Sequence, residues 1–138
     1  MPVLLQAIAE QNRVARKPIL LKVAPDLLPN ELEEVVATCE ENEIAGIIAT
    51  NTTHDHSAIP PERDEEGGLS GAPLREKSTA FVRAIAARST IPVIASGGIL
   101  DAASAREKVE AGAKLLQVYT GLIYRGPGLV REIAEALP

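Results

Sequence analysis

The sequence predicts an α/β protein in which four parallel strands alternate with helices. Four short apolar runs are nearly continuous rather than alternating, which is typical of strands that are buried on both faces. Segments with helical periodicity separate the runs, so each crossover contains a helix and the strands should be parallel. The 138 residues contain no low-complexity linker. We therefore expect one domain over residues 1–138.

The expected elements follow in order along the chain. A helix near residues 3–14 precedes a strand at 19–21. The next helix begins near Pro29, where Asn30 and Glu33 have the spacing of a capping box. One face of that helix carries Leu32, Val35, Val36 and Cys39. The second strand covers residues 46–49, and a long connection rich in Pro, Glu and Gly follows over 54–74. Loops of that length are usually functional or mobile.

The second half of the chain repeats the pattern. A helix over 75–88 precedes a strand at 91–95, and its inward residues should be Phe81, Val82 and Ile85. Asp101 is a good N-cap for a helix that ends before Gly112. A strand at 115–119 and a helix at 127–137 complete the fold. The inward residues of that last helix should be Leu129, Val130, Ile133 and Leu137.

Composition excludes several classes of protein. The chain is 46% hydrophobic and 24% charged, which fits a soluble globular protein rather than a disordered one. Aromatic residues make up only 2% and the net charge is −5, so a nucleic-acid-binding surface is disfavoured. One cysteine excludes a disulfide framework within the chain and a multi-cysteine zinc site. No signal peptide or membrane-spanning run is recognised, so a cytoplasmic protein is the default expectation.

Polar residues or glycines follow every predicted strand. Ligands of parallel α/β sheets bind at the carboxyl ends of the strands, so these segments should meet at one rim. The four segments are 22–26, 50–53, 96–98 and 119–121. Lys22 is notable because it lies within an apolar strand. It either extends to the rim or pairs with Asp26, or it places a positive charge against a bound anion. The last interaction is worth about 4 kcal/mol at ~4 Å and an effective dielectric near 20.

Two other rim segments suggest ligand chemistry. Asn51 offers a donor and an acceptor that suit an amide-like ring edge, although it could also be a turn residue or part of a glycosylation sequon. Gly97 and Gly98 precede the helix capped by Asp101, and bare backbone N–H groups at a helix N-terminus favour phosphate. A glycine pair also occurs in ordinary turns. Its place after the penultimate strand matches where (βα)8 barrels often hold phosphate.

Other candidates favour simpler interpretations. The segment His54-Asp55-His56 could bind a metal, but a solvated loop is the better interpretation because the chain has no further histidine. Cys39 should belong to the core. The run from Glu62 to Glu66 should be exposed.

Five motifs together resemble those of dihydroorotate dehydrogenase, specifically its class 2, quinone-linked form. They lie in the expected order at residues 22–27, 50–53, 67–74, 96–99 and 117–127. The resemblance implies a TIM (βα)8 barrel of which this chain is the C-terminal half, strands five to eight. It also implies FMN as cofactor and the oxidation of dihydroorotate to orotate in pyrimidine biosynthesis. Electrons would pass to a quinone, and the full-length class would be membrane-peripheral.

The resemblance also implies site roles. Lys22 would lie against the flavin ring and stabilise negative charge, and the substrate would be held by Asn51 and Thr52. The residues implied to bind FMN are Lys22, Thr50, Ser70, Gly71, Gly97, Gly98, Tyr119 and Thr120. The catalytic base of the class is a serine on a loop that precedes this segment. No catalytic residue is therefore assigned here, and activity of this chain alone is doubtful.

Half of a barrel would expose two sheet edges and apolar faces. We therefore expect two copies to associate, or this chain to pair with a separate first half. The alternative function is a non-catalytic half-barrel that binds phosphate or flavin and self-associates. Another phosphate-binding barrel enzyme is a third interpretation.

Overall fold

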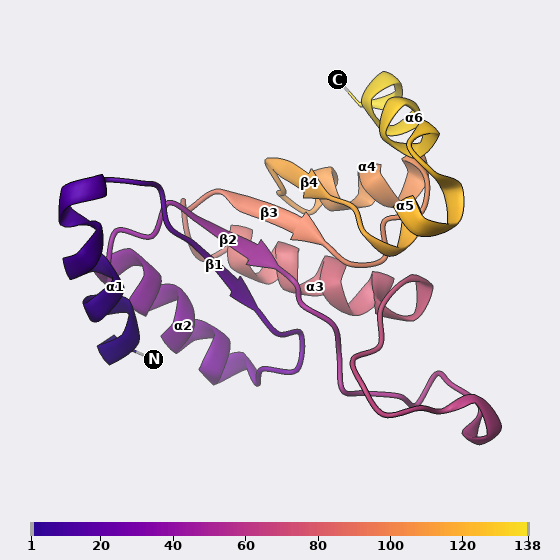
Figure 1. Ribbon diagram of the computed structural model, residues 1–138, viewed down its shortest axis with the longest axis horizontal. Coiled ribbons are helices and arrows are strands. Elements are labelled where there is room, and N and C mark those ends of the chain that lie inside the picture. The colour runs from indigo at the N-terminus through magenta and orange to yellow at the C-terminus, as the bar shows by residue number, and fades with distance from the viewer. Residues whose placement is uncertain (1, 138) are drawn as a thin grey trace.

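The four predicted strands form one parallel sheet. The computed structural model describes residues 2–137, and its strands are β1 (Leu20–Val23), β2 (Gly46–Ala49), β3 (Val93–Ser96) and β4 (Leu115–Gln117). They lie side by side in chain order, and each neighbouring pair is parallel (Figure 1). The predicted succession of parallel strands and helices is confirmed.

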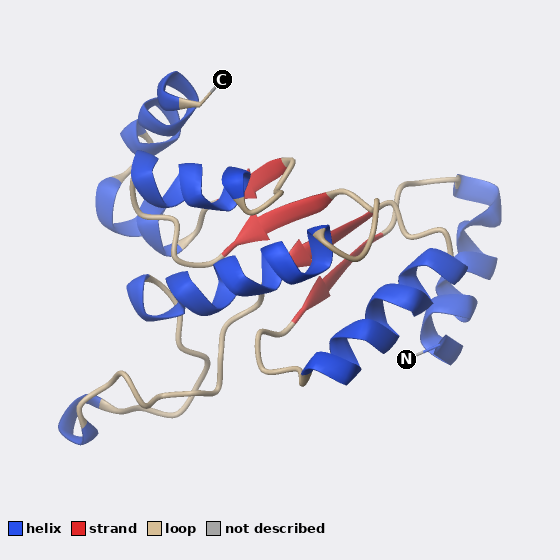
Figure 2. Ribbon diagram, turned by 180° about the vertical axis from the view of Figure 1, so that it is seen from behind, coloured by secondary structure: helices blue, strands red, loops and turns tan. Residues whose placement is uncertain are grey.

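Helices connect the strands and extend both ends of the chain. They are α1 (Pro2–Ala15), α2 (Pro29–Glu41), α3 (Arg75–Ala86), α4 (Ala102–Glu110), α5 (Thr120–Arg125) and α6 (Gly128–Ala136), with the 3-10 helices η1 (Pro61–Arg63) and η2 (Ala72–Leu74). Figure 2 shows α2, α3 and α4 on the same side of the sheet. Helix α5, which directly follows the last strand, was not predicted.

The main core lies between the sheet and these helices. Val23, Ile47 and Val93 point from the strands into this layer and are at most 4% exposed. The predicted inward face of α2 is confirmed, because Leu32, Val35, Val36 and Cys39 are all buried. On α3, Val82 and Ile85 are buried and Phe81 is partly buried against the same core. Burial raises the pKa of the Cys39 thiol to about 11, as expected of a core cysteine.

The predicted capping box of α2 is not formed, and only one of its two hydrogen bonds has a counterpart, two residues earlier in the chain. The helix begins at Pro29, and the backbone N–H of Leu28 donates to Glu31 Oε2 at 2.7 Å. The pair Asn30 and Glu33 does not form the box. Proline explains the earlier start, because it has no N–H to satisfy and its φ already suits the first helical position.

The predicted inward face of α6 is too wide. Leu129 and Ile133 are buried in a second apolar cluster with Ile99 of the β3–α4 connection, and Leu137 packs against that cluster. Val130 is 51% exposed, so its predicted inward position is wrong. Helix α6 packs against α4 and α5. This packing buries residues at i and i+4, such as Leu129 and Ile133, which lie on one face of the helix.

The face of the sheet opposite α2, α3 and α4 is less covered than the apolar runs predicted. The strand registers place Leu20, Ile48, Ile94 and Leu115 on this face, together with Lys22 and Gln117. At the two sheet edges, Leu20 is 48% and Leu115 is 65% exposed. We call this the open face. The expectation of burial on both faces therefore holds on the helix side alone.

The long connection between β2 and α3 extends away from the sheet (Figure 1). It contains η1 and η2 and is joined at its base by an antiparallel bridge between Thr53 and Leu69. The charge run from Glu62 to Glu66 is exposed at the far end of this connection, as predicted.

Candidate functional site

A cavity of about 480 Å³ lies at the carboxyl ends of the four strands. Its lining contains every residue singled out from the sequence as a cofactor or substrate contact: Lys22, Thr50, Asn51, Thr52, Ser70, Gly71, Gly97, Gly98, Tyr119 and Thr120. These residues come from four strand ends and from the connection before α3, which are distant in sequence. The structure thus brings the predicted site residues to one place, while their ligand roles stay predictions.

Lys22 projects from β1 on the open face. Its Nζ donates to Gln117 Oε1 of β4 at 3.3 Å, which links the two edge strands. The interpretation of Lys22 as a partner of Asp26 is wrong, because Asp26 Oδ1 accepts from Lys77 Nζ at 2.5 Å. Among the ion pairs of residues 2–137, none includes Lys22. Its positive charge is therefore available to an anionic ligand in the cavity.

The turn after β3 requires glycine at both positions. Gly97 and Gly98 have φ values of +101° and +70°, where other residues are strained. A Cβ on Gly98 would lie 2.3 Å from the Cα of Arg75, and one on Gly97 would lie 2.8 Å from Leu74 Cδ2. The turn is thus packed directly onto η2 and the start of α3. Its other side faces the cavity.

The N-terminus of α4 does not offer the free amides that the sequence suggested. The amide of Ser104 donates to Asp101 Oδ1 at 2.7 Å, and the amide of Ala102 donates to Glu132 Oε1 of α6 at 3.2 Å. The amides of Leu100 and Asp101 both donate to Ser104 Oγ. Side chains of the protein therefore occupy the amides of Ala102 and Ser104 in the first turn of α4. Anion-binding capacity at this end lies with the glycine turn and with the segment after β4.

The segment after β4 is held to the connection before α3. Ser70 Oγ and Thr120 Oγ1 lie 2.9 Å apart, and Gly71 with φ of +76° brings its backbone against the Thr120 side chain. Thr120 begins α5, and Tyr119 before it is 76% exposed. Hydroxyl groups from two distant segments therefore meet at the cavity wall.

A charged cluster anchors the segment that follows β2. The amide of Asn51 donates to the carbonyl of Val23, while Thr53 Oγ1 and the amide of His54 both donate to Asp26. Lys77 of α3 completes the cluster. Although burial raises the pKa of Asp26, hydrogen bonds from Lys77, Thr53 and the His54 amide outweigh it and lower the value to about 2. The strand end that presents Asn51 and Thr52 is therefore fixed on its outer side.

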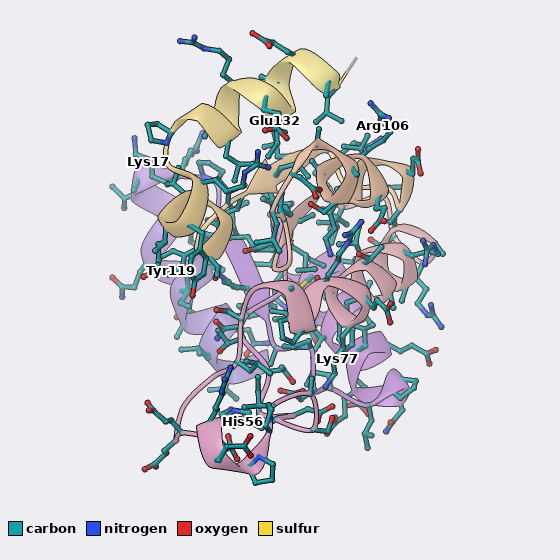
Figure 3. The ribbon with its side chains drawn as sticks, turned by 90° about the vertical axis from the view of Figure 1, so that its right-hand side faces the viewer. Lys17, His56, Lys77, Arg106, Tyr119 and Glu132 are labelled. Carbon is teal, nitrogen blue, oxygen red and sulfur yellow. The ribbon has the colours of Figure 1, made fainter. Side chains whose placement is uncertain are left out.

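The histidine segment belongs to the long connection, not to the cavity. His56 Nδ1 lies 2.5 Å from Asp64 Oδ1, and its Nε2 lies 2.9 Å from the carbonyl oxygen of Gly67. Figure 3 shows His56 at the end of this connection, apart from Tyr119. Within residues 2–137, no three histidine, cysteine, aspartate or glutamate side chains gather as potential metal ligands.

Sequence reasoning assigned no role to several residues at the site. Gln117 lines the cavity and contacts Lys22, and the polar side chain in an apolar strand was a usable signal. Ser96, at the end of β3, also lines the cavity. Lys108 of α4 lies behind the glycine turn and is fully buried. No sequence pattern indicated that Lys108 is buried near the site, because a lysine in a helical pattern is usually solvated.

Comparison with known proteins identifies relatives of this chain. The family model described as dihydroorotate dehydrogenase matches residues 3–138. A dihydroorotate dehydrogenase (quinone) from Ralstonia nicotianae is 46% identical over 96% of this chain and 39% of its own length. One from Christiangramia forsetii is 44% identical over 97% of this chain and 41% of its own length. The chain thus spans about two-fifths of these curated relatives.

Solved structures agree with the sequence relatives. The dihydroorotate dehydrogenase of Eimeria tenella in complex with ferulenol has a TM-score of 0.79 and 36% identity, covering 86% of this chain and 33% of that chain. The ligand-free form from the same organism has a TM-score of 0.77. Among the described residues, no helix combines the length and the apolar character needed to cross a membrane.

Proposed function

The chain belongs to the dihydroorotate dehydrogenase family, and on this premise we propose that it forms the cofactor- and substrate-holding part of a quinone-linked enzyme. The observation that most directly supports this proposal is the cavity at the strand ends, because residues of all five family-like motifs line it. The proposed reaction removes a proton from C5 and a hydride from C6 of dihydroorotate, which leaves the C5=C6 double bond of orotate. The two electrons then pass to a quinone.

The cavity fits FMN in size and in the chemistry of its walls. Its volume lies within the range of about 300–1,000 Å³ that is common for small-molecule sites. Gly71, Gly97 and Gly98 have backbone conformations that favour glycine and allow the main chain to approach a ligand. When bound, FMN would supply the hydride acceptor. We propose that the residues holding it are Lys22, Thr50, Ser70, Gly71, Gly97, Gly98, Tyr119 and Thr120.

The residues of this chain would bind the cofactor, orient the substrate and stabilise negative charge. The glycine turn and the Tyr119-Thr120 segment would receive the phosphate. Lys22, which forms no ion pair with any carboxylate of residues 2–137, would stabilise negative charge that reaches the flavin ring with the hydride. Asn51 and Thr52 would orient the pyrimidine through amide and hydroxyl groups. We assign no proton acceptor to this chain, because the family resemblance places the serine that acts as the catalytic base on a loop outside these residues.

The open face favours an assembled barrel. Its exposed apolar side chains and the free edges of β1 and β4 would be covered in a closed (βα)8 structure. We propose that the first half of a barrel, or a second copy of this chain, packs there. A lipid-soluble quinone would bring the complete enzyme to a membrane surface. The alternative is a non-catalytic half-barrel that binds phosphate or flavin and self-associates through the same open face.

The test combines flavin binding with turnover. The purified chain is titrated with FMN, alone and together with the first half of the Ralstonia nicotianae relative, and dihydroorotate with a redox dye is then added to each sample. We expect FMN to bind and dye reduction to require the added half. FMN binding with no turnover in either case would support the non-catalytic alternative. Absence of FMN binding in both cases would refute both assignments.

A further inference from the structure

Within residues 2–137, Lys108 of α4 is a buried cation that forms no ion pair with a carboxylate. Its exposed fraction is 0%, and its Nζ donates to the carbonyl oxygen of Arg75 at 2.9 Å, to Ser78 Oγ at 2.5 Å and to Thr79 Oγ1 at 2.7 Å. All three acceptors are neutral. The adjacent Glu107 is engaged by the Arg75 guanidinium instead. Burying a charge without a counter-charge is costly, so this arrangement needs an explanation.

The hydrogen-bond directions around Lys108 follow from the acceptors. Ser78 Oγ lies 2.9 Å from the carbonyl oxygen of Gly97 and 3.1 Å from that of Arg75, and Thr79 Oγ1 lies 2.7 Å from the Arg75 carbonyl oxygen. Since a carbonyl oxygen only accepts, each hydroxyl proton points to a carbonyl and each hydroxyl oxygen accepts from Lys108. All three protons of the ammonium group are then used. The charged form of Lys108 therefore satisfies every group in the cluster.

The same cluster supports the glycine turn from behind. Ser78 holds the carbonyl of Gly97, and the backbone of Arg75 lies against Gly98 so closely that no Cβ would fit. Lys108 binds both of these supporting residues. The position of the turn at the cavity thus depends on contacts that meet at a single Nζ atom.

We propose that Lys108 is a positioning residue for an anion-binding site at the Gly97–Gly98 turn, where it fixes the turn and supplies positive charge for a phosphate monoester. The identity of that ligand as the FMN phosphate rests on the proposed function. Lys108 does not touch the ligand itself. It acts through Ser78 and Arg75, and through its field in a poorly solvated region.

Protonation of Lys108 should control the site. Burial lowers the pKa of Lys108 from 10.5 to about 8, while Glu107 opposes that change and Arg75 adds to it. Glu107 and Arg75 are the charged groups that act on Lys108, and Asp101 in turn acts on Arg75. The neutral amine has a lone pair that accepts a hydrogen bond instead of donating one. Ser78 is the nearest hydroxyl, and turning its proton to Nζ would release Gly97.

The first test compares FMN with riboflavin, which lacks the phosphate. The FMN phosphate is already ionised above its second pKa near 6, so changes above about pH 7 arise elsewhere. From about pH 7 to about pH 9.5, we expect FMN affinity to fall roughly tenfold and riboflavin affinity to stay constant. Lys108→Met should bind FMN roughly tenfold more weakly at pH 7 and lose the pH dependence. The matched control is Lys114→Met at an exposed lysine, which should behave as the parent.

The second test needs no flavin. Amide resonances of Gly97 and Gly98 are followed by NMR in the unliganded chain, and inorganic phosphate is then added. We expect a titration near pH 8 and phosphate-induced shifts that weaken above it, both lost in Lys108→Met. Ser78→Ala replaces that variant if it fails to fold, and should uncouple the Gly97 amide. An unchanged titration in the folded variants would overturn the proposal. A parent that binds phosphate at the turn but neither flavin would refute the proposed function alone.

Discussion

At the residue scale, the charge of Lys22 is the feature that most directly supports the proposed flavin chemistry. The side chain projects into a cavity, and its contact in residues 2–137 is the neutral Gln117. A cation held by a neutral amide keeps its capacity to stabilise an anion. The side-chain amide of Gln117 therefore orients the charge of Lys22 without cancelling it.

Removing that charge should weaken both flavin binding and flavin reduction. We expect Lys22→Ala to bind FMN roughly tenfold more weakly, because a charged hydrogen bond contributes about 1.5–3 kcal/mol. The reduction potential of the bound flavin should also become more negative. Fluorescence titration and spectroscopic redox titration measure the two effects. Lys17→Ala, at an exposed lysine outside the cavity, is the control, and unchanged values in Lys22→Ala would remove the proposed role.

Residues at strand ends were predictable, whereas residues behind the site were not. Lys22 and Asn51 could be identified because a polar group at the end of a buried parallel strand has few structural reasons to be there. Lys108 could not, because its partners Ser78 and Thr79 lie on another helix about 30 residues away. Their meeting depends on how α3 and α4 pack. A single-helix pattern contains no such information.

At the element scale, helix starts illustrate what local patterns can resolve. Asp101 was identified as the N-cap of α4, and the structure confirms it. The same side chain occupies the amide that was expected to receive phosphate. Glu132, from α6, occupies another amide of that turn. A capping residue that marks a helix start also competes with any ligand there, and the second competitor is fixed only by tertiary packing.

The start of α2 gives a matched pair of substitutions. Glu31→Ala removes the acceptor for the Leu28 amide and should lower the free energy of unfolding by about 0.5–1 kcal/mol. Glu33→Ala removes only an exposed 3.4 Å ion pair with Arg88, so its effect should be near zero. Urea denaturation monitored by circular dichroism measures both. A larger loss of unfolding free energy in Glu33→Ala than in Glu31→Ala would instead support the Asn30–Glu33 capping box expected from the sequence.

The long connection should lose order as the pH rises. Both ring nitrogens of His56 face oxygen acceptors, and the hydrogen bond with Asp64 is the main cause that raises the pKa of His56. A raised folded-state pKa means that the stabilisation is complete below the ordinary value of 6.5 and is lost as pH rises through the folded value. Tryptic cleavage after Arg63 should therefore accelerate with pH. His56→Ala, measured in parallel, corrects for the protease, and equal ratios at all pH values would contradict this expectation.

At the scale of the whole molecule, the sheet has one buried face and one open face. The apolar runs predicted burial on both, and that reading fits a closed barrel better than four strands alone. The apolar residues of these four strands therefore suit a larger structure than the one formed by residues 2–137. The fraction of the relatives that this chain covers, about two-fifths, agrees with that explanation. Local patterning reveals which surfaces need a partner, but not which partner covers them.

The open face should mediate association. We expect the isolated chain to self-associate, because Leu115 and its neighbours at the edge strand would otherwise remain in water. Leu115→Asp should weaken this association and leave the helical core intact, since the side chain is 65% exposed and points away from α2 and α3. Val14→Asp is the control, because Val14 of α1 is 94% exposed and belongs to none of the four strands. Sedimentation velocity over a range of concentrations measures the effect. A first half from Ralstonia nicotianae that competes with self-association would locate both partners on the open face, whereas a parent that sediments as a monomer alone and in that mixture would show that this apolar surface needs no cover.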